Sequence, residues 1–446
     1  MQEVRFIDLF AGIGGLRLGF EEAFKSRGFA PICVMTSEIK PHALSVLHQN
    51  FEHGFQVGDI SKVKNSTIPD FDFLLGGFPC QPFSAGGKRH GFIDTRGTLF
   101  FEIERIIAEK KPYGFILENV EGLVKHDLES KSDTVGKTLR VILDKLISLG
   151  YQVSWNVLNA ANFGLPQARK RVFIVGTLDH KISLVGFEKH NARLKEILES
   201  GLPTLNTKFT KLLLKNFSLK ELHGKSIKDK RGGDDNIHSW DIGLKGAVTK
   251  EQSVLLNKLF KERRKKHWAK EIGIKWMDGM TLTYKQIKTF HDSPKLKEML
   301  DDLVAKGYLK FEHPKSLITE QTIFGEKNYR TENKALKPGY NIVTGKLSFE
   351  INKILDPNGI APTLVATDMA RLVVPDGDGL RRMTLREGLR LFGFPEWFEM
   401  PVKVEDGFDL LGNTVAVNVV KSVGDRVAEV FQPDYTTFKS EPVLSL

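Results

Sequence analysis

The stretch VRFIDLFAGIGG, residues Val4–Gly15, decides the fold of this chain. Its β-branched and aromatic residues predict a buried strand, and the apolar residues at helical spacing from Leu16 to Phe24 predict a helix after the glycines. Glycines at such a turn let the backbone approach a ligand, and the helix N-terminus offers free N–H groups. The stretch therefore predicts a site for a nucleoside-containing cofactor. A nicotinamide enzyme would fit it equally well, and a tight turn without a ligand is the plain alternative.

Strands and helices continue to alternate up to about residue 178. Further strands are predicted over Pro31–Thr36, Phe71–Leu75, Gly114–Leu117, Gln152–Leu158 and Arg171–Thr177. This alternation predicts an α/β fold with a mostly parallel sheet covered by helices on both faces. The alternation of strands and helices stops after Leu178 and resumes near Ile360. We therefore expect one body built from residues 1–178 and 360–446, with an inserted domain over residues 179–359.

Two carboxylates follow the strands that neighbour the glycine turn. Glu38 ends the second strand, about 20 residues after the turn, where a carboxylate can hold ribose hydroxyls. Asp59 ends the next predicted strand and is placed to accept a hydrogen bond from an adenine amino group. Both residues support a nucleoside-containing ligand without identifying it.

The stretch GGFPCQPFS, residues 76–84, carries the more specific chemical signal. A buried strand delivers Cys80 between two prolines, at the sheet edge where open α/β folds bind ligands. The prolines restrict the backbone on either side, and Lys88 and Arg89 lie nearby in sequence, which favours the thiolate. The other cysteine, Cys33, lies inside a predicted strand and is expected to be an inert apolar residue.

Charged residues at two further strand ends are candidate site groups. Glu118, in the run ILENV, is placed to hydrogen-bond N3 of a pyrimidine, with a capping or salt-bridging carboxylate as the alternative. Arg169 and Arg171 alternate at the start of the last strand and are predicted to hold a base oxygen or a phosphate. A solvated basic strand end is the alternative for these arginines.

The net charge of +10 is concentrated in the predicted insert. Residues 207–315 hold 25 of the 65 Lys and Arg and 14 of the 55 Asp and Glu, a net charge of +11, which leaves −1 for the rest. Such an excess is typical of a surface that binds a polyanion. The alternative is a lysine-rich surface that contacts only solvent.

Within the insert, three helices followed by a strand are predicted. The helices cover Glu251–Trp268, Thr283–Phe290 and Pro294–Lys306, and the strand covers Tyr308–Phe311. Residues 251–313 thus resemble a winged helix with the third helix in the recognition position, and ordinary domain helices are the alternative. The residues predicted to contact DNA here are Arg263, Arg264, Lys265, Lys266, Lys295 and Lys297.

The bulk composition narrows the class of protein. No apolar run approaches the ~18 residues needed to span a bilayer, and the N-terminus does not resemble a signal peptide. The two cysteines lie far apart without metal spacing, which predicts no metal site and no disulfide and fits the cytoplasm.

In order and spacing, six blocks resemble those of the DNA (cytosine-5)-methyltransferase family. They are the glycine turn, the Pro-Cys loop, the Glu-Asn-Val strand end, the Gln-x-Arg-x-Arg run at 167–171, TLREGLRLFGFP at 384–395 and LGNTV at 411–415. The resemblance covers residues 4–178 and 360–431. It implies a Rossmann-like S-adenosylmethionine-dependent fold with a mixed, mostly parallel sheet and a smaller inserted target-recognition domain.

The resemblance also implies a role for each matching residue. Cys80 would be the nucleophile, Glu118 would engage N3 and the exocyclic amine, and Arg169 and Arg171 would orient the cytosine and the catalytic loop. Residues implied to line the S-adenosylmethionine pocket are Phe10, Ala11, Gly12, Gly14, Gly15, Glu38, Ile39, Asp59, Ile60, Phe78, Pro79, Asn413 and Val415. Residues implied or predicted to contact DNA outside the insert are Gln81, Ser84, Lys88, Arg89, Arg96 and Thr363.

The expected activity is therefore methyl transfer from S-adenosylmethionine to C5 of a flipped-out cytosine in a specific duplex, with S-adenosylhomocysteine as product. We expect a cytoplasmic monomer of a restriction-modification system, without a stable complex with its restriction endonuclease. An RNA (tRNA) cytosine-5 methyltransferase is the alternative within enzymes. A non-catalytic DNA-binding regulator with the same fold is the alternative of another class.

Overall fold

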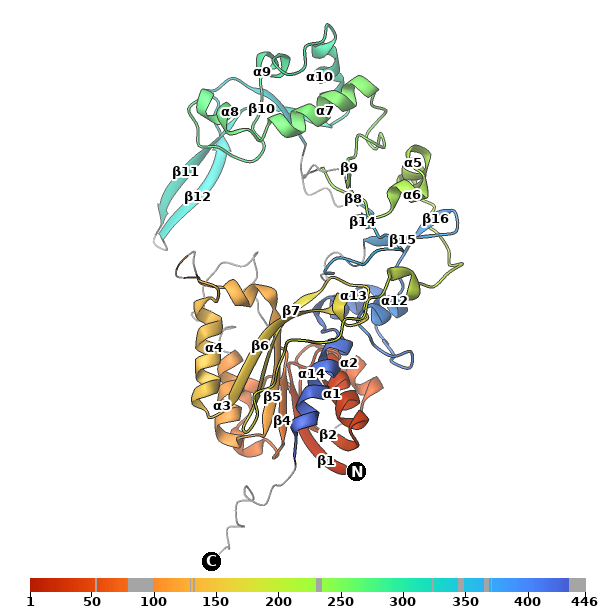
Figure 1. Ribbon diagram of the computed structural model, residues 1–446. Helices are drawn as coiled ribbons and strands as arrows, with labels where there is room; N and C mark the ends of the chain where they lie inside the picture. The colour runs from red at the N-terminus through yellow and green to blue at the C-terminus, as the bar shows by residue number, and fades with distance from the viewer. Residues whose placement is uncertain are drawn as a thin grey trace, which may run out of the picture. The chain divides into compact units, whose positions relative to one another are not determined.

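The computed structural model describes residues 1–52, 54–78, 99–128, 130, 133–229, 235–322, 325–343, 349–364, 369 and 371–432 (Figure 1). The chain forms two compact units. The first comprises Met1–Glu199, Pro357–Ala370 and Met383–Leu446, and the second comprises Ser200–Asp356 and Arg371–Arg382. We call them the sheet unit and the insert unit.

The sheet unit is built on seven strands in the order β3-β2-β1-β4-β5-β7-β6. Their bounds are β1 (Gln2–Leu9), β2 (Phe29–Ser37), β3 (Phe55–Val57), β4 (Phe73–Gly76), β5 (Gly114–Val120), β6 (Gln152–Asn159) and β7 (Lys170–Thr177). Every pairing is parallel except those of β7, which runs antiparallel to both β5 and β6. The predicted mixed, mostly parallel sheet is confirmed.

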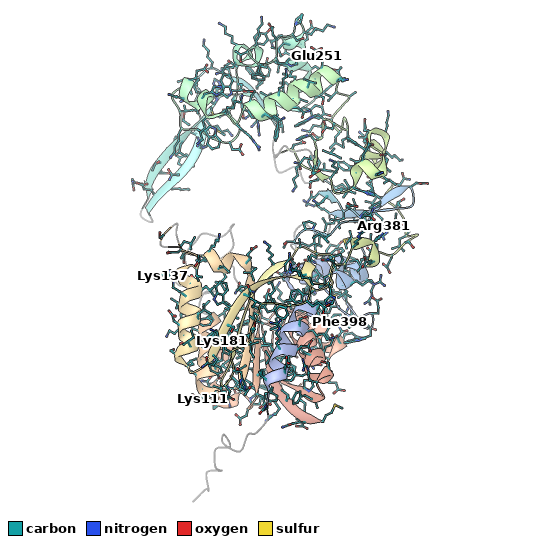
Figure 2. All side chains as sticks on the ribbon, viewed as in Figure 1. Lys111, Lys137, Lys181, Glu251, Arg381 and Phe398 are labelled. Atoms are coloured by element: carbon teal, nitrogen blue, oxygen red, sulfur yellow. The ribbon has the colours of Figure 1, made fainter. Side chains whose placement is uncertain are left out.

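Two apolar layers cover the sheet because strand side chains alternate between its faces. On one face, Phe6 and Leu75 pack with α1 (Gly15–Ser26) and α14 (Val417–Val430). On the other face, Ile7 and Leu74 pack with α3 (Leu99–Lys110) and α4 (Lys137–Ser148). Side chains fill both layers between sheet and helices (Figure 2).

Strand order reverses between β1 and β4. The chain leaves β1 outward to β2 and β3 on one side, and continues from β4 to β5 on the other. Open α/β sheets bind ligands at the carboxyl ends of strands beside such a reversal. The register pairs Leu9 with Gly76 and Gly76 with Leu117, so β1 and β4 end side by side, next to the last part of β5, which continues to Val120.

The insert unit holds a small sheet and a helical body. The sheet has the order β16-β15-β14-β8-β9 and carries a short helical pair, α5 (Lys208–Asn216) and α6 (Leu219–Leu222). Its strands are β8 (Ser226–Ile227), β9 (Asn236–Ile237), β14 (Lys353–Ile354), β15 (Leu372–Asp376) and β16 (Gly379–Arg382), the last containing the labelled Arg381 (Figure 2).

The helical body has its own apolar core, which includes Leu256, Leu300 and Tyr308. Its helices are α7 (Lys250–Glu262), α8 (Lys266–Glu271), α9 (Tyr284–Lys288) and α10 (Leu296–Ala305). The strand β10 (Leu309–Glu312) pairs antiparallel with β13 (Gly339–Ile342), and a hairpin of β11 (Lys315–Thr322) and β12 (Gly325–Glu332) lies between them in sequence.

The unit boundaries differ from the expected ones in three places, the smallest being residues 357–359, which belong to the sheet unit. Residues 179–199 belong to the sheet unit, since Ile182 and Leu184 pack in its core. Residues 371–382 belong to the insert unit, because β15 and β16 complete its small sheet. The long basic helix expected over 251–268 is broken into α7 and α8 around Arg263–Lys265.

Among the described residues, no helix is long and apolar enough to cross a membrane.

Candidate active site

The glycine turn between β1 and α1 combines left-handed backbone with one open position. Phe10, Gly12 and Gly14 have φ values of 58°, 57° and 83°. A Cβ at Gly14 would lie 2.4 Å from the Phe51 ring, so this position has no room for a side chain. A Cβ at Gly12 would meet nothing within 4 Å, so open space lies over Gly12. The turn thus leaves room for a ligand where the prediction expects one.

The third glycine of the turn, Gly15, serves helix packing instead. A Cβ there would lie 2.9 Å from both the Val415 Cγ1 and the Thr414 Oγ1 atoms. Gly19, one turn along α1, would in the same way meet Val420 at 2.6 Å. These glycines let α1 and α14 approach closely, which brings the LGNTV block to the glycine turn.

Glu38 lies directly beside the turn. One carboxylate oxygen accepts a hydrogen bond from the Gly12 N–H at 2.7 Å, and the other accepts from Ile39 and Lys40 N–H at 2.8 Å each. Three backbone donors fix the orientation of this carboxylate. The sequence placed Glu38 at the right strand end, but gave no hint that it also ties the turn together.

Asp59 caps the short 3-10 helix Ile60–Lys62 that follows β3. Its carboxylate accepts from the Ser61 hydroxyl at 2.7 Å and from the Ser61 N–H at 3.1 Å. Chiefly the Ser61 hydroxyl, with help from Lys62, holds the pKa of Asp59 below its usual value. The carboxylate is therefore an ionised acceptor, and its side chain is 40% exposed.

Glu118 and Arg171 form an ion pair where β5 and β7 lie side by side. The Arg171 Nε lies 3.0 Å from the Glu118 Oε1, and both side chains are only 14% exposed. Burial raises the pKa of Glu118, while the charges of Arg171 and Arg169 oppose that rise. This carboxyl can thus hold a proton at a higher pH than a surface glutamate, beside a cation that fixes its position.

The segment leading from β4 toward Cys80 runs beside Glu118. A Cβ at Gly77 would lie 3.8 Å from the Glu118 Oε2 atom. Asn119 donates a hydrogen bond from Nδ2 to the Phe78 carbonyl at 3.1 Å. Asn119 belongs to the Glu-Asn-Val strand end, and its 2% exposure next to the Phe78 carbonyl identifies it as an anchor of this segment.

Several predicted residues lie outside the described residues. They are Pro79, Cys80, Gln81, Ser84, Lys88, Arg89 and Arg96. The structure describes the chain up to Phe78, which is buried.

Arg169 does not have the exposure that the expected contact with a base or phosphate needs. It is 2% exposed and donates to the carbonyls of Leu364, Gly412 and Thr414 at 3.1, 3.1 and 2.6 Å. Its guanidinium also lies over the Phe392 ring. Arg169 therefore ties the two returning segments to the start of β7, and of the two arginines only Arg171 contacts Glu118.

The remaining predicted residues of the sheet unit fall into two groups. Ile60, Phe78 and Val415 are buried, whereas Ile39, Asn413 and Thr363 are exposed. Asn413 ends α13 (Val404–Asn413) and donates to the Asp409 carbonyl at 2.8 Å. The Thr363 hydroxyl donates to the Ala168 carbonyl, two residues before β7 begins. Thr363 is therefore attached to the same corner as Arg169.

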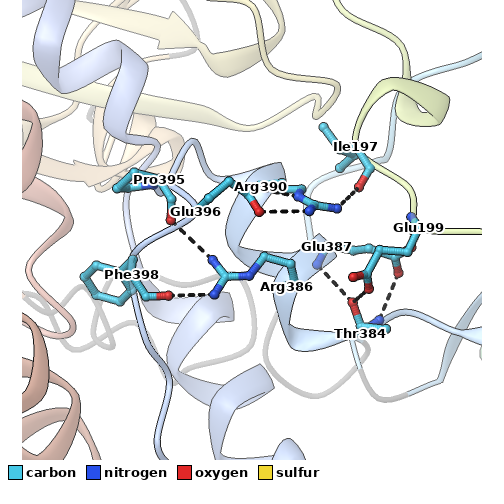
Figure 3. A network of polar contacts seen from close by, with 9 residues as sticks. All are labelled: Ile197, Glu199, Thr384, Arg386, Glu387, Arg390, Pro395, Glu396 and Phe398. Carbon is cyan, nitrogen blue, oxygen red and sulfur yellow. Dashed lines mark hydrogen bonds and ion pairs between the residues drawn. The ribbon is translucent and has the colours of Figure 1, made fainter.

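The TLREGLRLFGFP block forms a polar clamp around α12 (Leu385–Leu391) rather than a chemical site (Figure 3). Thr384 and Glu387 cap the helix reciprocally, and both also bond Glu199. Arg386 donates to the carbonyls of Pro395 and Phe398, and Arg390 binds Glu396 through two nitrogens. The block positions the returning chain.

Sequence reasoning missed Asp8, which lies on β1 two residues before the turn. It is fully buried, and neither carboxylate oxygen has a hydrogen-bond partner within the described part of the chain. Burial raises its pKa to about 8, with Arg17 opposing and Glu38 and Glu21 adding to the rise. The available signal was an acidic residue among the apolar residues of the second half of β1.

The basic residues of the insert are not equivalent. Arg263 is 3% exposed and donates to Asn341 Oδ1 at 2.6 Å, so the expectation that it contacts phosphate is not supported. Arg264 pairs with Asp278 at 2.9 Å. Lys265 and Lys266 are exposed, although Lys265 bonds Glu262.

The lysines near the expected recognition helix are exposed. Lys295 precedes α10, and Lys297 lies in its first turn. The Lys297 ammonium binds Asp301 at 2.5 Å and the Tyr340 hydroxyl at 3.1 Å.

The seven-stranded sheet with its strand-end groups defines a Rossmann-like methyltransferase fold. Among solved structures, the methyltransferase EhMeth of Entamoeba histolytica is similar with a TM-score of 0.53 at 15% identity, over 96% of this chain and 99% of that one. At that identity the likeness shows the fold alone.

The family model for C-5 cytosine-specific DNA methylases matches residues 4–429, and the chain belongs to this family. It is 58% identical to the Type II methyltransferase M.NlaIV of Neisseria lactamica, over 96% of this chain and 99% of the relative. It is 57% identical to M.NgoBV of Neisseria gonorrhoeae over the same shares. The predicted DNA (cytosine-5)-methyltransferase class is confirmed.

Proposed function

We propose that the chain transfers a methyl group from S-adenosylmethionine to C5 of a cytosine turned out of a specific DNA duplex. The observation that carries this proposal is the Glu118–Arg171 pair beside Gly77 and Phe78, two residues before Cys80, at the sheet edge that also holds the glycine turn. This edge can present a thiol, a proton donor and a cation to one pyrimidine ring.

The residues around the turn fit S-adenosylmethionine. Open space lies over Gly12, the oriented Glu38 carboxylate suits ribose hydroxyls, and the ionised Asp59 suits an adenine amino group. We propose that the pocket is completed by Phe10, Ala11, Gly14, Gly15, Ile39, Ile60, Phe78, Pro79, Asn413 and Val415. When bound, this cofactor supplies an electrophilic methyl group on a sulfonium.

The residues of the chain would make C5 reactive. C5 of cytosine is a weak nucleophile, so we propose that the Cys80 thiolate first adds to C6, which gives an enamine with a nucleophilic C5. Glu118 donates a proton or hydrogen bond at N3 as the negative charge develops, and Arg171 holds both Glu118 and the ring. After C5 takes the methyl group, loss of the C5 proton and expulsion of Cys80 restore the aromatic ring.

This chemistry requires the base to leave the helix, because C6 cannot be reached inside a stacked duplex. Turning the base out costs a few kcal/mol, which protein contacts to the extruded nucleotide must offset. We propose Gln81, Ser84, Lys88, Arg89, Arg96 and Thr363 for those contacts. Arg169 acts as a positioning residue, since both terminal nitrogens of its guanidinium donate to carbonyls of the returning chain.

Trapping on a fluorinated substrate tests the nucleophile. Wild-type protein with S-adenosylmethionine should form a covalent adduct with duplex DNA that carries 5-fluorocytosine, because fluorine cannot leave as a proton does. Cys80→Ser should form none, and Cys33→Ser is the matched control that should still form it. An adduct that persists in Cys80→Ser would overturn the assignment.

The cofactor pocket is tested by calorimetry. Gly12→Asp fills the open space over the turn and should abolish binding of S-adenosylmethionine. Gly28→Asp is a matched control at the far end of α1, because Gly28 also has a positive φ and open surroundings. Normal cofactor binding by Gly12→Asp would place the pocket elsewhere.

We further propose that the protein acts as a cytoplasmic monomer beside a restriction endonuclease, without a stable complex. The Type II names of the relatives support this context. Methyl transfer to a defined DNA duplex and to tRNA, measured side by side, tests the substrate. Transfer to tRNA alone would favour the RNA-methylating alternative.

A further inference from the structure

The hairpin of β11 and β12 is an unusual element of the insert unit. Eight residue pairs join the strands, from Lys315 with Glu332 to Thr322 with Gly325. The hairpin projects from the helical body, and its side chains stand on both sides of the ribbon (Figures 1 and 2). Residues 318–321 and 326–329 are all exposed, so neither face of the outer hairpin is packed on a core. A two-stranded ribbon of this kind is marginally stable alone and gains from a partner.

The base of the hairpin is firmly attached to the helical body. Arg330 donates to the carbonyls of Lys275 and Trp276 at 3.3 and 2.9 Å. Asn333 donates to the Ser316 hydroxyl at 3.0 Å, and its N–H donates to the Pro314 carbonyl at 2.8 Å. The base of the hairpin is therefore fixed to the helical body, while its outer half stays exposed.

One face of the outer hairpin carries side chains that hydrogen-bond well and are already oriented. Thr319 lies opposite Asn328 and donates to its Oδ1 at 2.6 Å, and Gln321 lies opposite Glu326 and donates to its Oε1 at 2.8 Å. After these cross-strand bonds, the Asn328 amide N–H groups can still donate to a ligand. The Asn328 carbonyl oxygen and the Glu326 carboxylate can still accept further hydrogen bonds. Asn and Gln suit adenine edges, and Glu suits the amino group of cytosine.

The dimensions and charge of the hairpin fit a groove of DNA. Strands of eight residues span about 26 Å, and the major groove admits a two-stranded ribbon. The hairpin holds three basic and three acidic residues, so it contributes no net attraction to phosphates. The neutral ribbon is rich in amides and hydroxyls, which suit contacts to base edges. The basic residues elsewhere in the domain would supply the attraction to the DNA backbone.

Helix α10, which the winged-helix interpretation places in the recognition position, is a poorer candidate. Its apolar side, with Leu296 and Leu300, is buried in the helical core. Its exposed side carries Glu298, Asp301 and Asp302 against the single helical lysine Lys297, which already binds Asp301. Asp302 pairs in the same way with Lys306, so most of the charged side chains on this face are engaged with each other rather than placed to bond base edges.

We propose that the β11–β12 hairpin, rather than α10, enters the major groove and reads base edges with Thr319, Gln321, Glu326 and Asn328. This inference rests on the proposed function, namely methylation of a specific duplex sequence. The occupant is duplex DNA, and a second copy of this chain paired along an exposed strand edge is the competing occupant.

The test compares hairpin and helix variants on a library of duplexes with random sequence, read by bisulfite sequencing. Gln321→Ala with Asn328→Ala should let the enzyme methylate additional related sites, with selectivity falling on the order of 10- to 100-fold per lost base contact. Asn257→Ala, at an exposed asparagine of α7, and Lys295→Ala, before α10, should leave the site unchanged. Relaxation by Lys295→Ala but not by the hairpin double variant would overturn the proposal.

If the hairpin double variant does not fold or is inactive, crosslinking of the wild-type protein tests the proposal instead. Wild-type protein on DNA with 5-iodouracil, whose iodine lies in the major groove, should crosslink through a peptide containing β11 or β12. Crosslinks confined to α10 would overturn the proposal. Unchanged selectivity together with a shift from dimer to monomer in sedimentation would assign the hairpin to a second copy. Absence of cytosine methylation by the wild type would instead show that the proposed function has failed.

Discussion

Two pairs of arginines, one in each unit, occupy different surroundings. In the sheet unit, Arg169 is buried on backbone carbonyls and Arg171 faces the Glu118 carboxylate at the end of β5. In the insert unit, Arg263 is buried on Asn341, and Arg264 pairs with Asp278, whose side chain is 54% exposed. Each pair thus has a buried member that holds structure together. The partners of the other two arginines differ: Arg171 lies beside the largely buried Glu118 at a strand end, whereas Arg264 lies beside the more exposed Asp278.

The difference follows from how each unit positions its side chains. In the sheet unit, the parallel register brings the ends of β1, β4 and β5 to one edge, so groups far apart in sequence meet there. In the described part of the helical body, β10 and β13 pair antiparallel, and Arg263 and Arg264 are each held by local partners. A site is therefore concentrated in the first unit, whereas recognition in the second depends on surface elements such as the hairpin.

The largest effect is expected at Glu118. Glu118→Gln keeps the shape of the side chain but removes the proton donor beside Arg171. We expect kcat to fall by about 10²- to 10⁴-fold, because a positioned acid contributes that much. Binding of S-adenosylmethionine and the unfolding midpoint should remain close to those of the wild type. Single-turnover methylation with tritiated cofactor measures the loss, and turnover within tenfold of wild type would contradict the role of Glu118.

A second prediction separates the two arginines of the sheet unit by stability. Arg169→Met leaves the carbonyls of Leu364, Gly412 and Thr414 without their donor and should lower the free energy of unfolding by about 3 kcal/mol or more. Arg171→Met should cost clearly less stability while it lowers turnover. Denaturant unfolding and kcat of both variants check this contrast. Equal stabilities would mean that Arg169 is not the structural member of the pair.

The sequence predicted those parts of the molecule that depend on short-range pattern. The strand–glycine–helix start, the alternation of strands and helices along the chain and the placement of Glu38 and Glu118 at strand ends follow from periodicity and turn residues. The partners of Arg169 are about 200 residues away in sequence, so no local pattern could show that this arginine is buried on carbonyls. The same holds for Arg263, whose partner Asn341 lies in β13.

The third prediction compares the buried Arg263 of the insert unit with the exposed lysines that follow it. Arg263→Met removes the donor to Asn341 and should lower the free energy of unfolding by about 1 to 3 kcal/mol. Lys265→Ala with Lys266→Ala should leave stability nearly unchanged. If these lysines contact phosphates, the slope of log K against log salt should fall in magnitude by about 0.9 for each. Fluorescence anisotropy over a salt series measures the slope, and an unchanged slope would make both lysines part of a solvated face.

The last prediction concerns Asp8, the buried acid on β1 two residues before the glycine turn. Its pKa in the folded protein is about 8, raised mainly by burial from the ordinary value of 3.8. Between these two values the folded state keeps the proton and the unfolded chain has lost it. The contribution of Asp8 to stability is therefore complete below pH 4 and is lost as the pH rises toward 8, at about 1.4 kcal/mol per pH unit. Above pH 8 both states are ionised, and no further loss is expected.

Asp8→Asn isolates this contribution, because an amide has nearly the shape of the protonated acid and does not titrate. The free energy of unfolding of the variant minus that of the wild type should rise by about 1.4 kcal/mol per unit from pH 5 to pH 7.5, and it should level off beyond pH 8. Guanidinium unfolding across that range measures the difference, with Asp70→Asn, at a largely exposed aspartate, as the control. A difference that does not change with pH would show that Asp8 is ionised in the folded protein. Its charge would then be stabilised by Arg17, which lies close enough to oppose the effect of burial.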